Sequence, residues 1–245
     1  MNAALFAGTR GIGRALARQL AECGYGIALL GRDPNELERS AADLAARGAA
    51  RPVATIPCDL AEPAGFAPAL DAAEHALGRL DLVVVTAAVF AGQDELEADA
   101  ELCRRLLELD FTNTILFCEQ ARVRLLAGGG GTLCVFSSVA GDRARKPVAL
   151  YGAAKAGLSH YLDGLELRYR AAGLRVVTVK PGFVHTAMTE GLQPPPFASE
   201  AEPVARAALR GILRGRRVVY APPIWRGVMA AVRALPRPLL RRSAF

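Results

Sequence analysis

The chain has 245 residues, of which 52% are hydrophobic and 22% charged, and its formal net charge is +6. This length suits one large α/β domain with a sizeable core, and the composition excludes a disordered chain. No apolar run reaches the length of a membrane span, and the five scattered cysteines show neither Cys-x-x-Cys spacing nor a histidine cluster, so we expect no transmembrane segment, no metal site and the reduced thiols of a cytoplasmic protein.

The first predicted unit is a strand, a glycine-containing turn and a helix. Residues 3–7 form an apolar strand pattern, and an amphipathic helix pattern follows and ends at Gly24. Glycines in the turn let a pyrophosphate approach the backbone, and the helix N-terminus stabilises its charge. We therefore predict that the phosphates of a dinucleotide bind at Gly8, Thr9, Arg10, Gly11, Ile12 and Gly13.

The end of the second predicted strand, residues 27–31, bears on the choice of cofactor. An acidic residue at this position would bind the adenosine ribose hydroxyls of NAD. Here a small glycine precedes Arg32, and Arg10 lies in the turn. Two guanidinium groups suit a 2′-phosphate, so we predict NADP(H). We interpret Asp33 as the N-cap of the helix that opens with Pro34.

The remaining elements alternate between strand and helix. The patterns predict strands at 53–57, 82–85, 133–136, 176–179 and 218–220, and helices at 63–78, 95–127, 151–172 and 202–214. We expect the second of these helical regions to break near Asp110. This alternation of helices with near-continuous apolar strands predicts a doubly wound Rossmann-type α/β fold, a seven-stranded parallel sheet with helices on both faces, as a single domain of residues 1–221. Asp59, after the third strand, is a candidate partner for an adenine amino group or else a loop-start carboxylate.

Three residues after the fifth strand carry candidate catalytic chemistry. Ser138 lies just beyond the strand, and Tyr151 and Lys155 lie one turn apart on one face of the next helix. A nearby ammonium favours the phenolate and should lower the pKa of the tyrosine toward neutrality. The serine hydroxyl could support charge that develops on a carbonyl oxygen. The alternative is a chance Tyr-x-x-x-Lys pair, with the tyrosine packed and the lysine solvated.

With the glycine turn and Pro181-Gly182, these residues resemble the short-chain dehydrogenase/reductase family over residues 3–220. The resemblance implies that Tyr151 is the acid/base, that Lys155 holds the nicotinamide ribose and lowers the tyrosine pKa, and that Ser138 polarises the carbonyl. Beyond the turn, the predicted cofactor contacts are Arg32, Asp59, Leu60, Ala87, Tyr151, Lys155, Pro181, Gly182, Val184 and Thr186.

The chain departs from the family pattern in three places. Ala7 stands where the turn usually begins with glycine, and Thr86-Ala87-Ala88 replaces the usual segment after the fourth strand. The fourth catalytic residue of the family, an asparagine, falls at Asp110, which adds a charge and removes an amide donor. Asn113, one turn on, is a second candidate for that role. His185 is a candidate substrate contact or a loop histidine without a role.

The C-terminal segment is basic. No acidic residue follows Glu202, and ten arginines lie from Arg206 onward; since the total is +6, residues 1–205 carry −4. The pattern predicts a basic amphipathic extension at 222–245, on which apolar residues oppose arginines. It could lie on an anionic bilayer, or its apolar side could pack on this domain or on a second subunit. The two sides are Ile224, Val228, Val232 and Leu235 against Arg226, Arg233 and Arg237.

Three segments show a narrower resemblance. Residues 137–142, 180–188 and 220–229 resemble the decaprenyl-phosphoryl 2-keto-pentose reductases, which implies a lipid-linked ketosugar as substrate. We therefore expect an NADPH-dependent ketone reductase, a homo-oligomer, cytoplasmic or peripheral at the inner membrane surface. A binding motif for nucleic acid is absent, so we expect no such partner. The alternatives are a reductase or dehydrogenase of a soluble ketone, such as a ketoacyl or secondary-metabolite intermediate, and an NADP-binding sensor without turnover.

Overall fold

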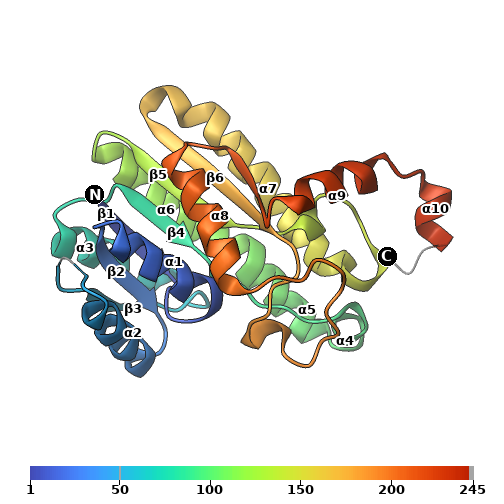
Figure 1. The fold of residues 1–245 in the computed structure, drawn as a ribbon, viewed down its shortest axis with the longest axis horizontal. Coiled ribbons are helices and arrows are strands. Elements are labelled where there is room, and N and C mark those ends of the chain that lie inside the picture. Colours follow the sequence, from blue (N-terminus) through green and yellow to red (C-terminus); the bar gives the residue numbers. More distant parts are fainter. Residues whose placement is uncertain (50, 243–245) are drawn as a thin grey trace.

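The computed structural model describes residues 1–49 and 51–242, and in these residues seven strands form one parallel sheet (Figure 1). The strand order is β3-β2-β1-β4-β5-β6-β7. This confirms the predicted fold class, and each strand lies within two residues of its predicted bounds. The strands are β1 (Asn2–Phe6), β2 (Gly26–Gly31), β3 (Ala54–Pro57), β4 (Leu82–Val85), β5 (Gly131–Phe136), β6 (Leu174–Pro181) and β7 (Val218–Ala221).

Two helical layers cover the sheet, one on each face. Alternate side chains of a strand point to opposite faces, so in β1 Leu5 packs in one layer and Phe6 in the other. Because both faces are buried, the strands are mostly apolar. One layer consists of α1 (Gly11–Glu22), α2 (Pro34–Ala46) and α8 (Ala201–Leu213), and the other of α3 (Phe66–Leu77), α6 (Thr114–Ala127) and α7 (Ala149–Tyr169).

In the region predicted as one or two helices over 95–127, the helical structure is interrupted at two places. Asp99 separates α4 (Gln93–Ala98) from α5 (Ala100–Leu107) because its carboxylate caps α5. The break expected near Asp110 is a π turn at Glu108–Asn113, before α6. Short 3-10 turns lie at Pro63–Gly65, Val139–Gly141, Lys146–Val148, Arg170–Ala172 and Ala187–Thr189.

The C-terminal segment forms α9 (Ile224–Ala234) and α10 (Arg237–Arg242), which extend beyond the sheet at one end of the molecule (Figure 1). The prediction of which residues form the apolar side of this segment is wrong in part. Ile224 is 48% exposed and Leu235 38% exposed. The buried side instead contains Trp225, Met229 and Val232, which pack against Val139 of the domain. The large indole at the start of the helix sets the buried face, and residues four and seven positions later share it. No helix in the described part of the chain has the length and apolar content to cross a bilayer.

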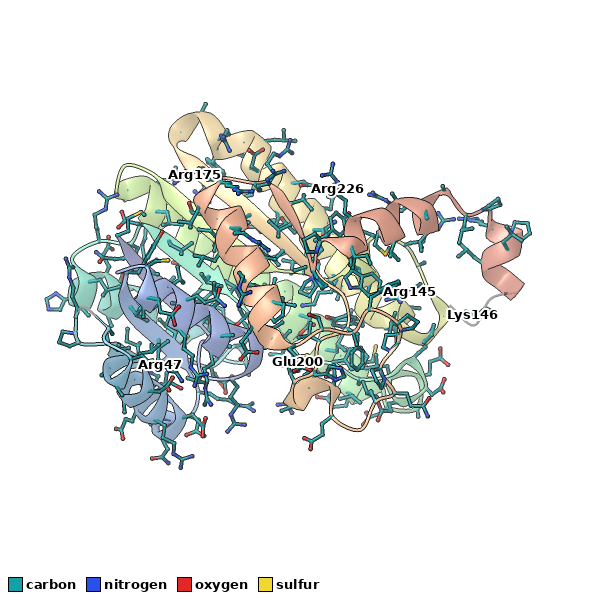
Figure 2. All side chains as sticks on the ribbon, in the orientation of Figure 1. Arg47, Arg145, Lys146, Arg175, Glu200 and Arg226 are labelled. Atoms are coloured by element: carbon teal, nitrogen blue, oxygen red, sulfur yellow. The ribbon has the colours of Figure 1, made fainter. Side chains whose placement is uncertain are left out.

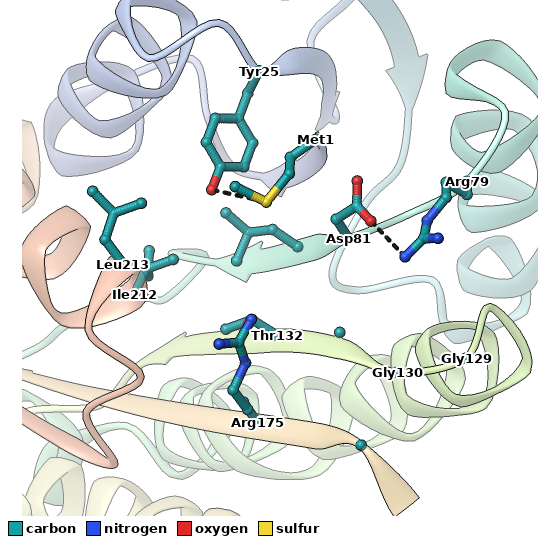
Figure 3. Close-up of a pocket in the computed structure, with 13 residues that line it drawn as sticks. Met1, Tyr25, Arg79, Asp81, Gly129, Gly130, Thr132, Arg175, Ile212 and Leu213 are labelled. Carbon is teal, nitrogen blue, oxygen red and sulfur yellow. Dashed lines mark hydrogen bonds and ion pairs between the residues drawn. The ribbon is translucent and has the colours of Figure 1, made fainter.

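A parallel sheet has a carboxyl-end edge and an amino-end edge, and the two differ here. The amino-end edge contains a hollow of about 440 Å³, into which Arg175 projects (Figure 3). In this hollow Arg79 pairs with Asp81 at 2.7 Å. Cys23, the exposed C-cap residue of α1, lies just before β2 begins and therefore at the same edge. The predicted site residues follow the carboxyl ends of the strands, on the opposite edge.

Candidate active site

A cavity of about 1280 Å³ lies along the carboxyl-end edge of the sheet. Parallel α/β sheets bind ligands at this edge, where the strand order reverses, here between β1 and β4. Gly8 does not line the cavity; it packs beneath the turn against Leu29. The other predicted cofactor contacts all line it: Thr9, Arg10, Gly11, Ile12, Gly13, Arg32, Asp59, Leu60, Ala87, Tyr151, Lys155, Pro181, Gly182, Val184 and Thr186.

The turn after β1 has the backbone shape that a pyrophosphate requires. Gly11 has φ 48°, and Ala7 has φ 63°, a left-handed conformation that glycine adopts more easily. A Cβ on Gly13 would lie 2.7 Å from Thr86 Oγ1, whose hydroxyl donates to the Ala7 carbonyl at 3.0 Å. The first turn of α1 carries no acidic residue and no side-chain cap, so its N–H groups face the cavity unopposed by local negative charge. These residues fit the phosphates of a dinucleotide.

At the adenosine end of the cavity, the N-cap interpretation of Asp33 is confirmed. Its carboxylate accepts hydrogen bonds from the backbone N–H of Asn35 at 3.0 Å and of Glu36 at 3.3 Å. Arg32 is exposed beside it. No sequence pattern singled out Glu36, whose mostly buried carboxylate lines the cavity and pairs with Arg10 at 3.4 Å. Glu36 also pairs with Arg14 and Arg39.

Three of the predicted catalytic side chains meet at the start of α7. The Ser138 hydroxyl is close enough to the Tyr151 hydroxyl to act to lower its pKa, and Lys155 Nζ lies 5.5 Å from the centre of the Tyr151 ring. Ser138 Oγ also accepts from the Ala140 N–H at 3.1 Å, which fixes the turn after β5. The chance interpretation, a solvated lysine, is wrong because Lys155 is 1% exposed.

Asp110 binds Lys155 directly. Its Oδ2 lies 3.0 Å from Lys155 Nζ, and its Oδ1 accepts from the Val89 N–H at 2.7 Å. The π turn places this carboxylate under α7, where it is fully buried and does not line the cavity. Asn113 does not share this position, because its amide donates to the Leu60 carbonyl at 2.9 Å. His185 is exposed and does not line the cavity.

The expected lowering of the pKa of Tyr151 is wrong for this arrangement. Burial raises the pKa of Tyr151; Lys155 acts to lower it, and Asp110 acts to raise it. Burial alone would lower the pKa of Lys155, but Asp110 and Tyr151 together outweigh burial and raise it. Burial also raises the pKa of Asp110, against the pull of Lys155. The buried carboxylate therefore offsets part of the effect that the ammonium has on the phenol.

Sequence reasoning missed three residues that line the cavity near Tyr151. The Phe90 ring packs edge-on against the Tyr151 ring at 5.1 Å. Arg145 comes from the loop before α7, and Trp225 comes from the start of α9. Figure 2 labels Arg145 and Arg226, the residue that follows Trp225. The only signal for Trp225 was that it is the one tryptophan of the chain, at the start of an amphipathic stretch.

The sequence pattern of the short chain dehydrogenase family matches residues 2–196. With the fold and the site above, the chain belongs to this family and is an oxidoreductase of the type that uses a nicotinamide cofactor. An uncharacterized oxidoreductase of Mycobacterium tuberculosis is 35% identical over 240 residues, which cover 97% of this chain and 95% of the relative. Carbonyl reductase family member 4 of Xenopus tropicalis is 30% identical over 190 residues, 78% of each chain.

The structure of a short-chain type dehydrogenase/reductase from Mycobacterium ulcerans superimposes with a TM-score of 0.82 at 25% identity, and the match covers 99% of this chain and 98% of that one. The match extends through nearly the whole chain, so it includes most of the C-terminal segment as well as the sheet.

Proposed function

We propose that the chain is an NADPH-dependent reductase of ketones. The observation that carries this proposal is the grouping of Ser138 and Tyr151 beside the buried Lys155, in the cavity that the glycine turn also lines. The name of the carbonyl reductase relative supports a ketone as the group that reacts.

When bound, the nicotinamide supplies a hydride to the carbonyl carbon. The hydroxyl groups of Ser138 and Tyr151 donate hydrogen bonds to the carbonyl oxygen, which becomes more negative as the reaction proceeds. Tyr151 then gives its proton to that oxygen, and Lys155 stabilises the phenolate that results. Because burial raises the pKa of Tyr151, the phenol stays protonated at neutral pH, which suits a proton donor in reduction.

The charges at the adenosine end support NADP(H) over NAD(H). Asp33 Oδ1 is engaged as the cap of α2, where it accepts from two backbone N–H groups. Arg32 is exposed at the rim of the cavity and Arg10 lies across it in the glycine turn. Guanidinium groups bind phosphate by paired, charge-assisted hydrogen bonds.

For the substrate, we propose a ketosugar linked to a polyprenyl phosphate, turned over at the cytoplasmic membrane surface. Two features besides the sequence resemblance support this choice. The loop after β6 exposes apolar side chains that line the cavity, and the basic C-terminal segment follows closely. These apolar residues are Met188 (43% exposed), Leu192 (44%) and Phe197 (51%). A soluble ketone is the competing substrate, and a panel of both kinds decides between them.

Replacing Tyr151 with phenylalanine tests the catalytic assignment. Tyr151→Phe should lower kcat with NADPH by about 10²- to 10⁴-fold, the usual contribution of a general acid, and leave NADPH binding nearly intact. Tyr161→Phe is the matched control: it lies on the same helix, but its hydroxyl donates to Glu119 outside the cavity. Wild-type kcat in Tyr151→Phe would show that another group supplies the proton.

A further inference from the structure

Asp142 links the turn after β5 to two strands of the sheet. Its Oδ1 accepts a hydrogen bond from Lys180 Nζ at 2.6 Å, and its Oδ2 accepts from the Tyr220 hydroxyl at 2.7 Å. Lys180 in β6 and Tyr220 in β7 are direct neighbours in the parallel register, so their side chains lie on the same face of the sheet. The carboxylate, whose side chain is 3% exposed, therefore joins the turn to both strands in a largely buried place.

Within the turn, Asp142 is connected to Ser138 by a short, tightly wound stretch of backbone. The Asp142 N–H donates to the Val139 carbonyl at 3.1 Å, and the Gly141 N–H donates to the Ser138 carbonyl at the same distance. The Ser138 hydroxyl accepts from the Ala140 N–H at 3.1 Å. Because these bonds leave the turn little freedom, a shift of Asp142 moves the serine hydroxyl with it.

On the side of the strands, the same carboxylate is connected to two further walls of the cavity. Lys180 directly precedes Pro181 and Gly182, which line the cavity and are predicted cofactor contacts. The Tyr220 ring packs against the hydrophobic cluster in which α9 is seated, and α9 also lines the cavity. Asp142, Lys180 and Tyr220 do not line the cavity themselves. They therefore hold three of its walls together from behind.

We infer that Asp142 is a positioning residue for the reduction: it fixes the Ser138 turn relative to the backbone that follows β6, and so sets where the serine hydroxyl lies relative to the cofactor and the carbonyl group. This inference rests on the proposed function for the reaction. Hydrogen bonds to a carboxylate are short and directional, and a largely buried site weakens them little. Since a displacement of about 1 Å in a reacting group can cost about 10²-fold in rate, this anchoring affects turnover.

Replacing Tyr220 with phenylalanine removes one of the two bonds and keeps the ring in its apolar cluster. In Tyr220→Phe, kcat should fall about 3- to 10-fold, because the turn loses part of its anchor, while the dissociation constant of NADPH changes little. Tyr161→Phe is the matched control: its hydroxyl also donates to a carboxylate, that of Glu119, at 2.7 Å, but outside the cavity. A role in stability alone would leave kcat unchanged in both variants.

Two substitutions of similar size at residue 142 separate the bridge from the packing. Asp142→Leu makes neither bond, so kcat should fall about 10- to 100-fold. Asp142→Asn can still accept from Lys180 and can donate to the Tyr220 hydroxyl, so it should recover most of that loss. Circular dichroism establishes that the variants are folded at the temperature of the assay.

Amide hydrogen exchange of the turn gives a readout that needs no turnover. The Ala140 N–H is bonded to the Ser138 hydroxyl, so its exchange rate reports on the position of the serine itself. In Asp142→Leu and Tyr220→Phe, the amides of residues 139–142 should exchange about 10-fold faster or more than in the wild-type protein. In Tyr161→Phe they should exchange at the wild-type rate.

Two results would overturn the inference: an unchanged kcat in folded Asp142→Leu, or wild-type exchange of residues 139–142 in Tyr220→Phe. If Asp142→Leu does not fold, Tyr220→Phe and its control decide by both measurements. Absence of turnover by the wild-type protein with every ketone would instead count against the proposed function. The exchange measurement then still tests whether Asp142 fixes the turn, which separates the two failures.

Discussion

Asp110 gives Lys155 a charged partner inside the protein. The two groups are 0% and 1% exposed and lie 3.0 Å apart, beneath the phenol that they influence. A buried ammonium without a counter-ion is strongly destabilising, whereas the pair together is close to neutral for stability. The carboxylate at this position therefore keeps Lys155 charged in the buried site, and it reduces the positive field at Tyr151 in doing so.

Removing that carboxylate should destabilise the fold in a pH-dependent way. Asp110→Asn leaves Lys155 buried without its partner, which should cost about 3–5 kcal/mol at neutral pH. Burial then lowers the folded-state pKa of Lys155 below its unfolded value. Between those two values the unfolded chain binds more protons, so the stability of the variant rises with pH. Urea unfolding at about pH 7 and about pH 9 measures both effects.

Two variants serve as comparisons for this experiment. Asp110→Asn combined with Lys155→Met should recover most of the lost stability, because no buried charge remains. Asp163→Asn, on the exposed side of α7, should change the free energy of unfolding by about 0.5 kcal/mol or less. Equal stability of Asp110→Asn and wild type at neutral pH would mean that Lys155 is held by other groups.

Arg32 is expected to set cofactor preference. Arg32→Ala should weaken NADPH binding by about 10-fold or more, since a charge-assisted contact to the 2′-phosphate is lost, and should change NADH binding little. Titration of both cofactors measures the two dissociation constants. Arg39→Ala is the control, because Arg39 is also exposed near Glu36 but does not line the cavity. Equal losses for the two cofactors would remove Arg32 from this role.

Among the elements, the turn after β5 and helix α7 make the contact that aligns the catalytic hydroxyls. A Cβ on Gly141 would lie 2.7 Å from the backbone N of Ala156 and from the carbonyl carbon of Lys155. A Cβ on Gly152 would lie 2.9 Å from the Ala140 carbonyl oxygen. This close approach of backbone to backbone fixes Ser138 relative to Tyr151, one on the turn and one on the helix.

Two glycine substitutions should therefore act in opposite directions. Gly141→Ala forces the turn away from α7, so it should lower stability by about 1–3 kcal/mol and also lower kcat. Gly164 lies on the exposed side of α7 with open space around it, so Gly164→Ala should raise stability by about 0.4–1 kcal/mol. Thermal unfolding and turnover of both variants test this. A Gly141→Ala protein as stable and active as wild type would contradict the close contact.

The elements differ in how far the sequence determines them. The strands follow from local apolar runs and the cap at Asp33 from an Asp-Pro pair, and both are found as predicted. The buried face of α9 depends on a distant partner, Val139, which no local pattern reveals. The same holds for Glu36 and for the Asp110–Lys155 pair. Burial of Tyr151 by distant segments raises its pKa, against the local expectation. Packing and desolvation between distant segments decide these features.

Across the whole molecule, positive charge is concentrated in the C-terminal segment: residues 222–245 carry +5, and residues 1–221 carry +1. This segment packs on the domain through Trp225, Met229 and Val232. Other apolar side chains remain exposed beside the arginines, a combination suited to the surface of an anionic bilayer. These side chains are Ile224 (48% exposed), Leu235 (38%) and Leu239 (53%).

We predict that the protein sediments with vesicles in which about one third of the lipid is phosphatidylglycerol, and that salt releases it, because exposed charges are screened. Reversing Arg233 and Arg237 to glutamate should abolish this binding and leave reduction of a short soluble ketone intact. Reversing Arg175 and Arg216, which are exposed on other parts of the surface, changes the net charge equally and should keep binding. Failure to sediment at low salt would rule out membrane contact and favour a soluble substrate.

The common direction of the parallel strands also offers a practical route to a biosensor. Cys23 is the exposed thiol among the five cysteines, at the edge of the sheet opposite the catalytic cavity. Burial raises the pKa of Cys58 to about 11 and also raises that of Cys118 and Cys134, so these thiols stay protonated and unreactive toward maleimide. Once the half-buried Cys103 is replaced with serine, a maleimide-coated electrode should therefore immobilise the enzyme in one orientation, with the mouth of the cavity turned toward the analyte.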